Sequence, residues 1–207
     1  MAEASKPRTR GRPALTPAQV DDMRARIAAA ATRLFKSEGY GAVSMRRLAA
    51  EIGCAPMTLY NYYPAKIDIL RHLWADVLDV VFTRVGQALA GAGPPVDRLK
   101  AAGRIYVGYW LDHVDDYRMV FMAEGVTQDE VSVFVLDDVT TQRTAALAET
   151  LCAATGLPAS SAELKLRLDL MVSGLTGISH GLVTISAYPW SDPLVLVDAL
   201  VDRIVAA

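Results

Sequence analysis

Apolar residues recur at spacings of three and four over most of the chain, which is the period of helices that bury one face. The first run follows Thr16-Pro17-Ala18-Gln19, in which threonine can cap a helix, proline suits its first position and glutamine completes a capping box. The pattern predicts a helix from about residue 17 to Glu38-Gly39. Its buried face consists of Val20, Met23, Ile27, Ala30, Ala31 and Leu34.

Two short helices separated by a glycine are predicted next. Ser44 can cap the first helix, Gly53 ends it, and Pro56 at a first-turn position begins the second. Two short helices joined by a turn of about three to four residues form a helix-turn-helix. Any helical bundle contains such corners, so a function for this corner needs further evidence. The inward-facing residues are Leu48, Ala49, Ile52 and Leu59.

A long helix is predicted from Lys66, after Pro64, to the turn at residues 91–95. The pattern indicates further helices at about 96–113, 115–124, 129–155, 159–186 and 192–206. The β-rich run 131–135 is short and is assigned to the start of a helix. The sequence thus predicts an all-α fold in three parts: a flexible basic arm over 1–15, a three-helix domain over 16–65 and a helical bundle over 66–207.

Charge divides the chain into two unlike parts. Residues 1–72 contain twelve Lys and Arg against six Asp and Glu, whereas the rest contains nine against seventeen, for a net charge of −2. The basic part indicates a polyanionic partner, and the acidic part keeps its own surface away from that partner. An apolar share of 52% and 21% charged residues exclude disorder as the overall state.

The cysteines and the apolar runs indicate the cellular location to expect for the protein. Two cysteines, Cys54 and Cys152, cannot form a disulfide scaffold or a four-cysteine zinc site, which favours a reducing, cytoplasmic setting. The N-terminus lacks the apolar region of a signal peptide. The best membrane candidate, residues 170–185, is short and carries five polar residues, so it is expected to be a buried helix of a soluble protein.

The segment from Ser44 to Leu70 resembles the signature of the tetracycline-repressor (TetR) family of bacterial transcription regulators. The matching positions are Ser44, Leu48-Ala49, Gly53, Leu59-Tyr60-Asn61-Tyr62-Tyr63 and Lys66. With the preceding helix, the resemblance covers about residues 16–72. It implies a DNA-binding helix-turn-helix domain, a C-terminal domain that dimerises and binds a small molecule, and a transcriptional repressor that this molecule releases from a palindromic operator.

The second short helix is the element that would enter the major groove. Its exposed face is expected to consist of Ala55, Pro56, Met57, Thr58, Asn61 and Tyr62. Only Thr58 and Asn61 can read bases by hydrogen bonds, so apolar contacts with thymine methyl groups and DNA shape should matter. Ala55 replaces the polar cap usual in the family.

Phosphate contacts are expected on either side of that helix. By resemblance they involve Thr58, Tyr60, Tyr62 and Lys66. Ser44, Arg46 and Arg47 would add a hydroxyl, charge and amide donors at the start of the first short helix. Tyr63 is expected to pack in the core, and the alternative for Lys66 is a solvated helix start.

The basic arm contains Arg8, Arg10 and Arg12, and its Arg-Gly-Arg-Pro segment resembles the core of an AT-hook. Arginines of such segments lie in narrow A·T-rich minor grooves, where the negative potential is enhanced. The alternative is a basic tail that only increases solubility.

Gly174, Gly177 and Gly181 lie on one stripe of the predicted helix over 159–186. Because this stripe lacks side chains, another helix can approach it closely. By resemblance, the last two helices pair with those of a second copy in a homodimer. The candidate interface residues are Gly174, Gly177, Ile178, Gly181, Leu182, Leu196, Leu200 and Ile204.

Aromatic and polarisable residues concentrate between Tyr106 and Met122, as in a pocket for a small apolar or aromatic effector. The candidate effector-binding residues are Tyr106, Tyr109, Trp110, His113, Phe121, Met122, Met171 and His180. The alternative is an ordinary core. Ser179-His180-Gly181 resembles a family subtype named for a Trp-x-x-His-Gly signature, although Gly177 holds the place of the tryptophan. His180 is expected to be a buried histidine with its hydrogen bonds satisfied.

Enzyme motifs are absent from the sequence: it has no Gly-x-Ser-x-Gly, phosphate loop or dinucleotide fingerprint. His113 and its neighbouring aspartates lack a second histidine, so no metal or cofactor is expected. The alternative function is a helical small-molecule-binding or interaction module without specific DNA recognition. No recognisable motif identifies the effector, the operator or the regulated genes, or distinguishes repression from activation.

Overall fold

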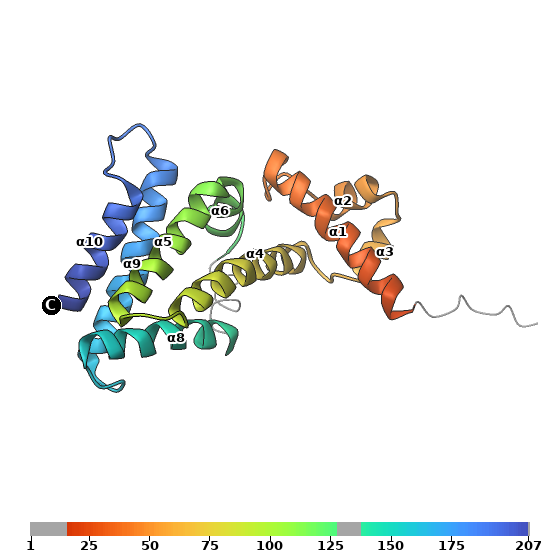
Figure 1. Cartoon of the computed structure of the whole chain (residues 1–207). Helices are drawn as coiled ribbons and strands as arrows, with labels where there is room; N and C mark the ends of the chain where they lie inside the picture. Colours follow the sequence, from red (N-terminus) through yellow and green to blue (C-terminus); the bar gives the residue numbers. More distant parts are fainter. Residues whose placement is uncertain (1–15, 128–137, 207) are drawn as a thin grey trace, which may run out of the picture.

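The computed structural model describes residues 16–127 and 138–206, and all regular structure in these ranges is helical (Figure 1). The helices are α1 (Pro17–Glu38), α2 (Met45–Ile52), α3 (Pro56–Tyr60), α4 (Lys66–Leu89), α5 (Pro95–Asp112), α6 (Val114–Phe121), α8 (Asp138–Thr155), α9 (Ala162–Thr184) and α10 (Pro193–Ala206). The all-α prediction is confirmed. The β-rich run 131–135 lies outside the described residues.

Local signals set the start of α1 as the sequence predicts. The Thr16 hydroxyl accepts a hydrogen bond from the Gln19 amide, and the Gln19 side chain accepts one from the Thr16 amide. This reciprocal capping box satisfies two amides that the helix itself leaves without partners. The helix ends at Gly39, whose positive φ of 81° turns the chain toward α2.

Helices α2 and α3 form the predicted helix-turn-helix beside α1. The Ser44 hydroxyl caps α2 by accepting from the Arg47 amide. Gly53 ends the helix with φ 71° and ψ 35°, a left-handed conformation that costs a residue with a Cβ about 1 to 2 kcal/mol. Ala49 is completely buried, which lets α2 pack closely, and Leu59 anchors α3 in the same core.

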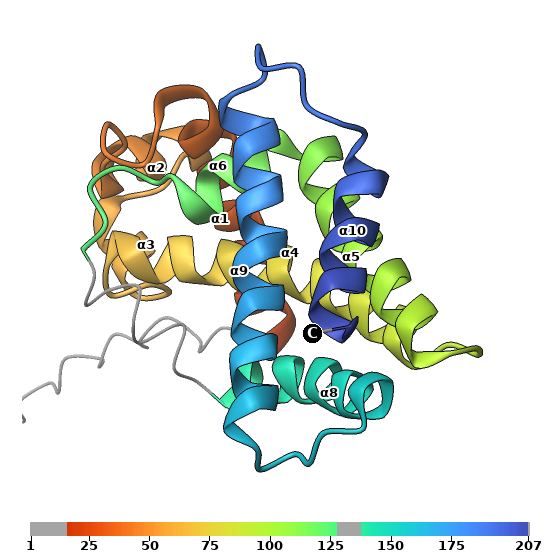
Figure 2. The same cartoon turned by 90° about the vertical axis from the view of Figure 1, so that its left-hand side faces the viewer.

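The remaining helices form a bundle with α5 at its centre. Helix α5 packs against α4, α8, α9 and α10, and the bundle core includes Leu99, Leu151, Met171 and Val201. Figure 2 looks at the end of the bundle away from α1, α2 and α3, and it shows α9 in front with α10 beside it. Among the helices of residues 16–127 and 138–206, none lies in front of α9 in this view.

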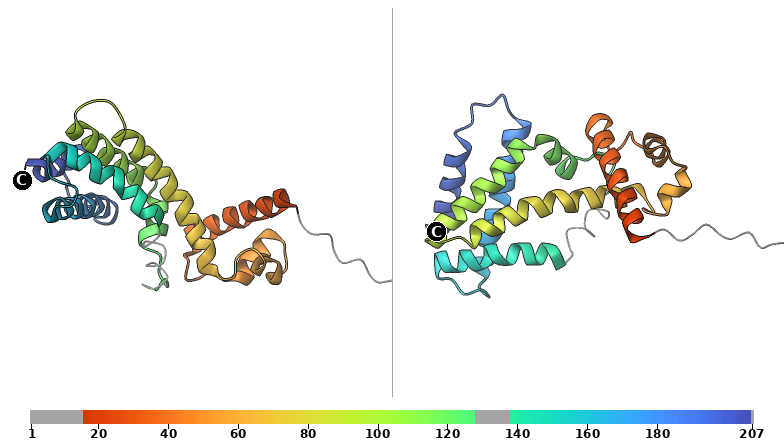
Figure 3. Two further views of the ribbon diagram at one scale, coloured as in Figure 1. Left: turned by 90° about the horizontal axis from the view of Figure 1, so that it is seen from below. Right: turned by 45° about the vertical axis from the view of Figure 1, so that its right-hand side comes forward.

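Two helices connect the bundle with α1, α2 and α3. Figure 3 shows α4 running from the bundle to α1, and its first turns, through Trp74, belong to the core around α1. Helix α6 contacts α1, α4 and α5, and its Met119 is buried in the core around α1. The domain boundary at 65/66 stays a prediction. None of the described helices is long and apolar enough to cross a membrane.

Candidate functional site

The exposed face of α3 is mostly apolar, as the sequence predicts. Ala55, Pro56 and Met57 are exposed, and Met57 has 72% of its surface accessible. No side chain caps the helix at Ala55, in agreement with the loss of the family's usual polar cap. This face can make apolar contacts but offers few groups that would distinguish bases by hydrogen bonds.

The polar and aromatic residues on α3 and directly after it are exposed, half-buried or buried. Asn61 and Tyr60 are exposed, whereas Thr58 and Tyr62 are half-buried and Tyr62 packs against the core around α1. Tyr63 is buried in that core, which confirms its predicted role. Burial raises the pKa of Tyr63 above its ordinary value.

At the start of α2, the structure separates Arg46 from Arg47. Arg47 donates to Glu51 at 2.8 Å and to Glu38 at 3.1 Å. The hydrogen bond with Glu51 raises the pKa of Arg47, and the same bond lowers the pKa of Glu51. Two carboxylates of this chain thus balance the charge of Arg47, and its contact with DNA stays a prediction. Arg46 is exposed and makes no ion pair within residues 16–127 and 138–206.

Lys66, whose predicted contact with a DNA phosphate stays a prediction, has acceptors inside the protein. Its Nζ donates to the carbonyl oxygens of Tyr40 at 2.6 Å and Val43 at 2.9 Å, and lies 3.9 Å from the centre of the Tyr40 ring. Sequence reasoning missed these acceptors because they lie 23 and 26 residues earlier in the chain. Lys66 thus fastens the start of α4 to the turn between α1 and α2, and the ammonium has partners inside the protein.

The arm residues Arg8, Arg10 and Arg12 lie outside the described residues, so minor-groove binding stays a prediction. Ser44, Arg46, Ala55, Pro56, Met57, Thr58, Tyr60, Asn61 and Tyr62 all lie on α2, on α3 or at their ends, and their contacts with DNA also stay predictions.

The predicted effector residues between α5 and α6 come together around Trp110. This residue is completely buried, and its ring lies between 5.2 and 6.0 Å from the rings of Tyr106, Tyr109, Tyr117 and Phe121. The side chains fill this space as a packed core. The Trp110 Nε1 is nevertheless buried without a hydrogen-bond partner in the described part of the chain. Burial also raises the pKa of Tyr106.

The two predicted effector histidines lie at the edge of this aromatic cluster. His113 is exposed, stacks on the Tyr109 ring at 4.2 Å, and its Nδ1 lies 2.9 Å from the Tyr109 carbonyl oxygen. His180 is exposed, so the prediction of a buried histidine is wrong, although its Nδ1 lies 3.1 Å from the Tyr117 hydroxyl. Burial raises the pKa of Tyr117 to about 12.

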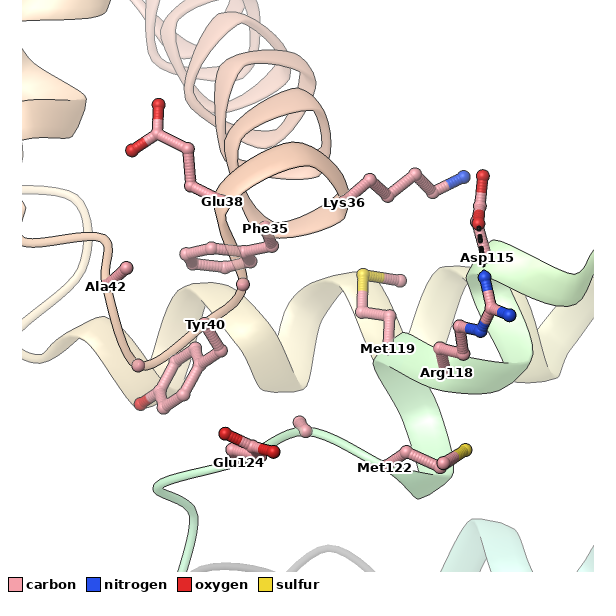
Figure 4. A pocket seen from close by; sticks show the side chains of 13 residues that line it. Phe35, Lys36, Glu38, Tyr40, Ala42, Asp115, Arg118, Met119, Met122 and Glu124 are labelled. Carbon is pink, nitrogen blue, oxygen red and sulfur yellow. Dashed lines mark ion pairs between the residues drawn. The ribbon is translucent and has the colours of Figure 1, made fainter. Parts of the chain in front are cut away.

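Met122 and Met171 do not join the aromatic cluster. Met171 is buried in the bundle core. Met122 lines a different cavity of about 500 Å³, between the end of α1 and α6 (Figure 4). Lys36 of α1 reaches across this junction to Asp116 of α6 at 2.7 Å, and the Trp74 Nε1 of α4 donates to the Met119 carbonyl at 2.8 Å. Helix α6 is thus fixed to both α1 and α4.

The glycine stripe of α9 is largely occupied within the chain. A Cβ at Gly174 would lie 2.6 Å from a methyl carbon of Leu200, and one at Gly181 would lie 3.1 Å from the Trp190 ring. Ile204 is buried. The helix that approaches Gly174 is therefore α10 of the same chain. The assignment of Gly174, Gly181 and Ile204 to a dimer interface stays a prediction. The predicted residues Ile178, Leu182 and Leu200 also pack against the bundle core.

The apolar surface without a partner lies beside that stripe. Gly177 is exposed and has nothing within 4 Å of its Cβ position. Leu166 and Leu170 on α9 are 53% and 51% exposed, and Leu194 and Val195 at the start of α10 are 52% and 60% exposed. Leu196 is half-buried. An exposed apolar surface of this kind is typical of an interaction site.

Comparison with known proteins agrees with this geometry. The family model described as bacterial regulatory proteins, tetR family, matches residues 27–73. The chain is 26% identical over 115 residues to the HTH-type transcriptional activator FasR of Mycolicibacterium smegmatis, covering 56% of this chain and 52% of that protein. It is 44% identical over 45 residues to the HTH-type transcriptional repressor DrrR1 of Streptomyces coeruleorubidus, covering 22% and 17%. The chain thus spans about half, or less, of the length of these curated relatives.

The fold of the larger part of the chain also has a close counterpart. A TetR-family transcriptional regulator from Mesorhizobium loti superposes with a TM-score of 0.67 at 19% identity, over 91% of this chain and 97% of that one. At this identity the likeness concerns the fold. The family model meanwhile covers most of α1, the helix-turn-helix and the start of α4. Residues 27–73 thus match the model of the tetR family of bacterial regulatory proteins, and the larger part of the chain has the fold of solved regulators of that family.

Proposed function

We propose that this chain is a sequence-specific, DNA-binding transcription regulator that works as a homodimer and is released from DNA by a small apolar or aromatic effector. The proposal rests mainly on which residues of α3 are buried and which are exposed. Its Leu59 is fixed in the core, while Ala55, Pro56 and Met57 stand exposed at the start of the helix, in the segment that matches the family. Such a helix can enter a major groove by its N-terminal residues.

A homodimer is supported by the exposed apolar surface on α9 and α10. Leu166, Leu170 and Gly177 lie along α9, and Leu194 and Val195 lie at the start of α10, beside the C-terminal end of α9. Burying this surface against a second copy would remove it from water, and two-fold symmetry would make the same patch serve both chains. A two-fold dimer in turn implies a palindromic operator, with half-site centres about 10 bp apart or a little more.

Selection of duplexes from a random DNA pool tests the DNA part of the proposal. The purified chain should enrich a two-fold symmetric motif, and light scattering at micromolar concentration should give the mass of a dimer. Binding to every duplex alike, or a monomer without a selected motif, would favour the alternative of a helical small-molecule-binding module. Because a regulator of bacterial DNA works where the DNA is, the proposed location is the cytoplasm.

The effector is placed at the aromatic cluster around Trp110. The buried Nε1 of Trp110 offers a hydrogen bond to an acceptor, and Tyr106, Tyr109 and Phe121 surround the indole ring. The side chains pack closely, so an effector must displace some of them. Phe121, which is 43% exposed, is the first candidate for displacement because it lies at the surface.

Coupling between effector and DNA is supported by the position of α6. Tyr117 and Phe121 of α6 contact Trp110, whereas Met119 lies in the core around α1 and Asp116 pairs with Lys36. A shift of α6 would therefore move α1 and α4 together, and with them α3. The coupling expected through α4 therefore gains a second connecting helix. Typical coupling energies of about 1 to 3 kcal/mol imply roughly 5- to 150-fold release.

Repression is the simplest regulatory role for this arrangement. The DNA-bound protein would block transcription, and an effector that releases it from DNA would end the block. Reciprocity tests the coupling: saturating operator DNA must weaken effector binding by the same factor by which the effector weakens DNA binding. Effectors would be found by a thermal-shift screen of aromatic and aliphatic compounds. Identical effector affinity with and without operator would refute the switch while leaving DNA binding intact.

A further inference from the structure

Most of the cations on α1, α2 and the start of α4 already have partners inside the protein. These are Arg26 with the Ile52 carbonyl, Arg33 with Glu51, Lys36 with Asp116, Arg47 with Glu38 and Glu51, Lys66 with two carbonyls and Arg71 with Asp68. In the described part of this region, Arg24 and Arg46 make neither an ion pair nor a hydrogen bond. The twelve Lys and Arg residues of 1–72 therefore overstate the positive charge that is available to a polyanion.

Arg24 borders a groove between the first half of α1 and α3. The groove has a volume of about 680 Å³, and Figure 1 shows α3 beside this part of α1. The α3 side of the groove consists of Thr58 on α3 and of Asn61 and Tyr62 in the turn that directly follows the helix. None of these residues belongs to the exposed apolar start at Pro56 and Met57.

The groove carries the chemistry that a phosphodiester needs. Arg24 offers a guanidinium, Thr58 and Tyr62 offer hydroxyl groups, and Asn61 offers an amide. The guanidinium fork matches phosphate oxygens, and hydroxyl and amide donors make up many of the remaining backbone contacts in DNA complexes. Asp22 is the one carboxylate that borders the groove, and Arg24 makes no ion pair with it.

The position of the Arg24 charge agrees with this geometry. Burial raises the pKa of Tyr63, and the positive charge of Arg24 opposes that rise. Arg24 lines the groove together with Thr58 and Asn61, which places it on the side of α1 that faces α3. It is therefore directed toward the helix that is expected to enter the major groove.

We propose that the sugar–phosphate backbone of one DNA strand lies in this groove and that Arg24 binds its phosphate. The inference rests on the proposed DNA-binding function and adds a contact from α1, outside the helix-turn-helix itself. The basic arm is a poorer occupant, because Arg24 would repel its arginines. Arg24 positions the protein on DNA, and base preference remains with the exposed start of α3.

The test is the salt dependence of binding to a selected operator by the full chain. Replacing Arg24→Ala should lower the slope of log K against log salt by about 0.9 per subunit, or about 1.8 for a dimer. At about 0.15 M salt this corresponds to roughly 5-fold weaker binding per subunit and ~30-fold for two subunits. Arg24→Lys should keep the slope, because the charge is retained. The motif selected from random DNA should be unchanged in both variants.

Arg118→Ala is the matched control, because it removes one exposed arginine from α6, away from α3. Its slope should equal that of the wild type. If the wild type binds its operator and Arg24→Ala has the wild-type slope, the groove inference is wrong although the proposed function stands. If the wild type selects no DNA, the proposed function itself fails.

Discussion

Lys66→Met separates the structural role of Lys66 from the phosphate contact that the family resemblance implies. Methionine keeps the apolar part of the side chain but removes the ammonium that donates to the Tyr40 and Val43 carbonyls at 2.6 and 2.9 Å. A hydrogen bond to a charged group contributes about 1.5 to 3 kcal/mol, and an exposed cation–π contact about 0.5 to 1 kcal/mol. Because Lys66 is half-buried, water replaces part of this loss.

The expected destabilisation is therefore about 2 to 4 kcal/mol, a large part of the roughly 5 to 15 kcal/mol that stabilises most domains. For a protein of this size it corresponds to a decrease in Tm of roughly 5 to 15 °C. Thermal unfolding followed by circular dichroism measures the change. Below the transition, operator binding by the folded variant should keep the wild-type salt slope.

Arg46→Met is the comparison, because Arg46 is an exposed cation at the start of α2. We expect its unfolding free energy to stay within about 0.5 kcal/mol of the wild type, while the salt slope falls by about 0.9 per subunit. An unchanged Tm and a lower salt slope for Lys66→Met would instead place the ammonium on a DNA phosphate.

Three further outcomes follow from the structure. Gly53→Ala should cost about 1 to 2 kcal/mol in urea unfolding, because φ is 71°, and equal stability would contradict the left-handed turn. Gly177→Glu should keep the helical circular dichroism but give a monomer in light scattering, since its Cβ position is open, and a stable dimer would place the interface elsewhere. Tyr117 has a pKa of about 12 in the folded chain against about 10 unfolded, so the unfolded chain loses the proton first and stability should fall between about pH 10 and 12. Tyr117→Phe should flatten that part of the pH profile of unfolding, and an unchanged profile would exclude Tyr117 as its cause.

Local signals in the sequence were sufficient wherever neighbouring residues decide the structure. The capping box at Thr16, the cap at Ser44 and the left-handed Gly53 each depend on atoms within a few residues, and each lies where the pattern predicts it. The buried face of α1 follows in the same way from the helical period, since Ile27 and Leu34 are both buried.

Roles that depend on distant partners could not be predicted in this way. The acceptors of Lys66 lie more than 20 residues earlier in the chain, and the carboxylates around Arg47 come from two different helices. Periodicity also shows that Gly174 and Gly181 share a stripe without showing which helix covers it. The same limit applies to Met122, which is close to the aromatic cluster in sequence but lines the cavity between α1 and α6.

We propose that two copies of α3, one from each chain of a dimer, read the two halves of one symmetric DNA site. The most direct measurement compares a selected symmetric duplex with the same duplex in which one half-site is scrambled, by fluorescence anisotropy at a fixed salt concentration. We expect two chains per symmetric duplex and a loss of affinity of at least 100-fold on scrambling, because several mismatched pairs cost about 1 to 3 kcal/mol each. Equal affinity for both duplexes and for random DNA would contradict it.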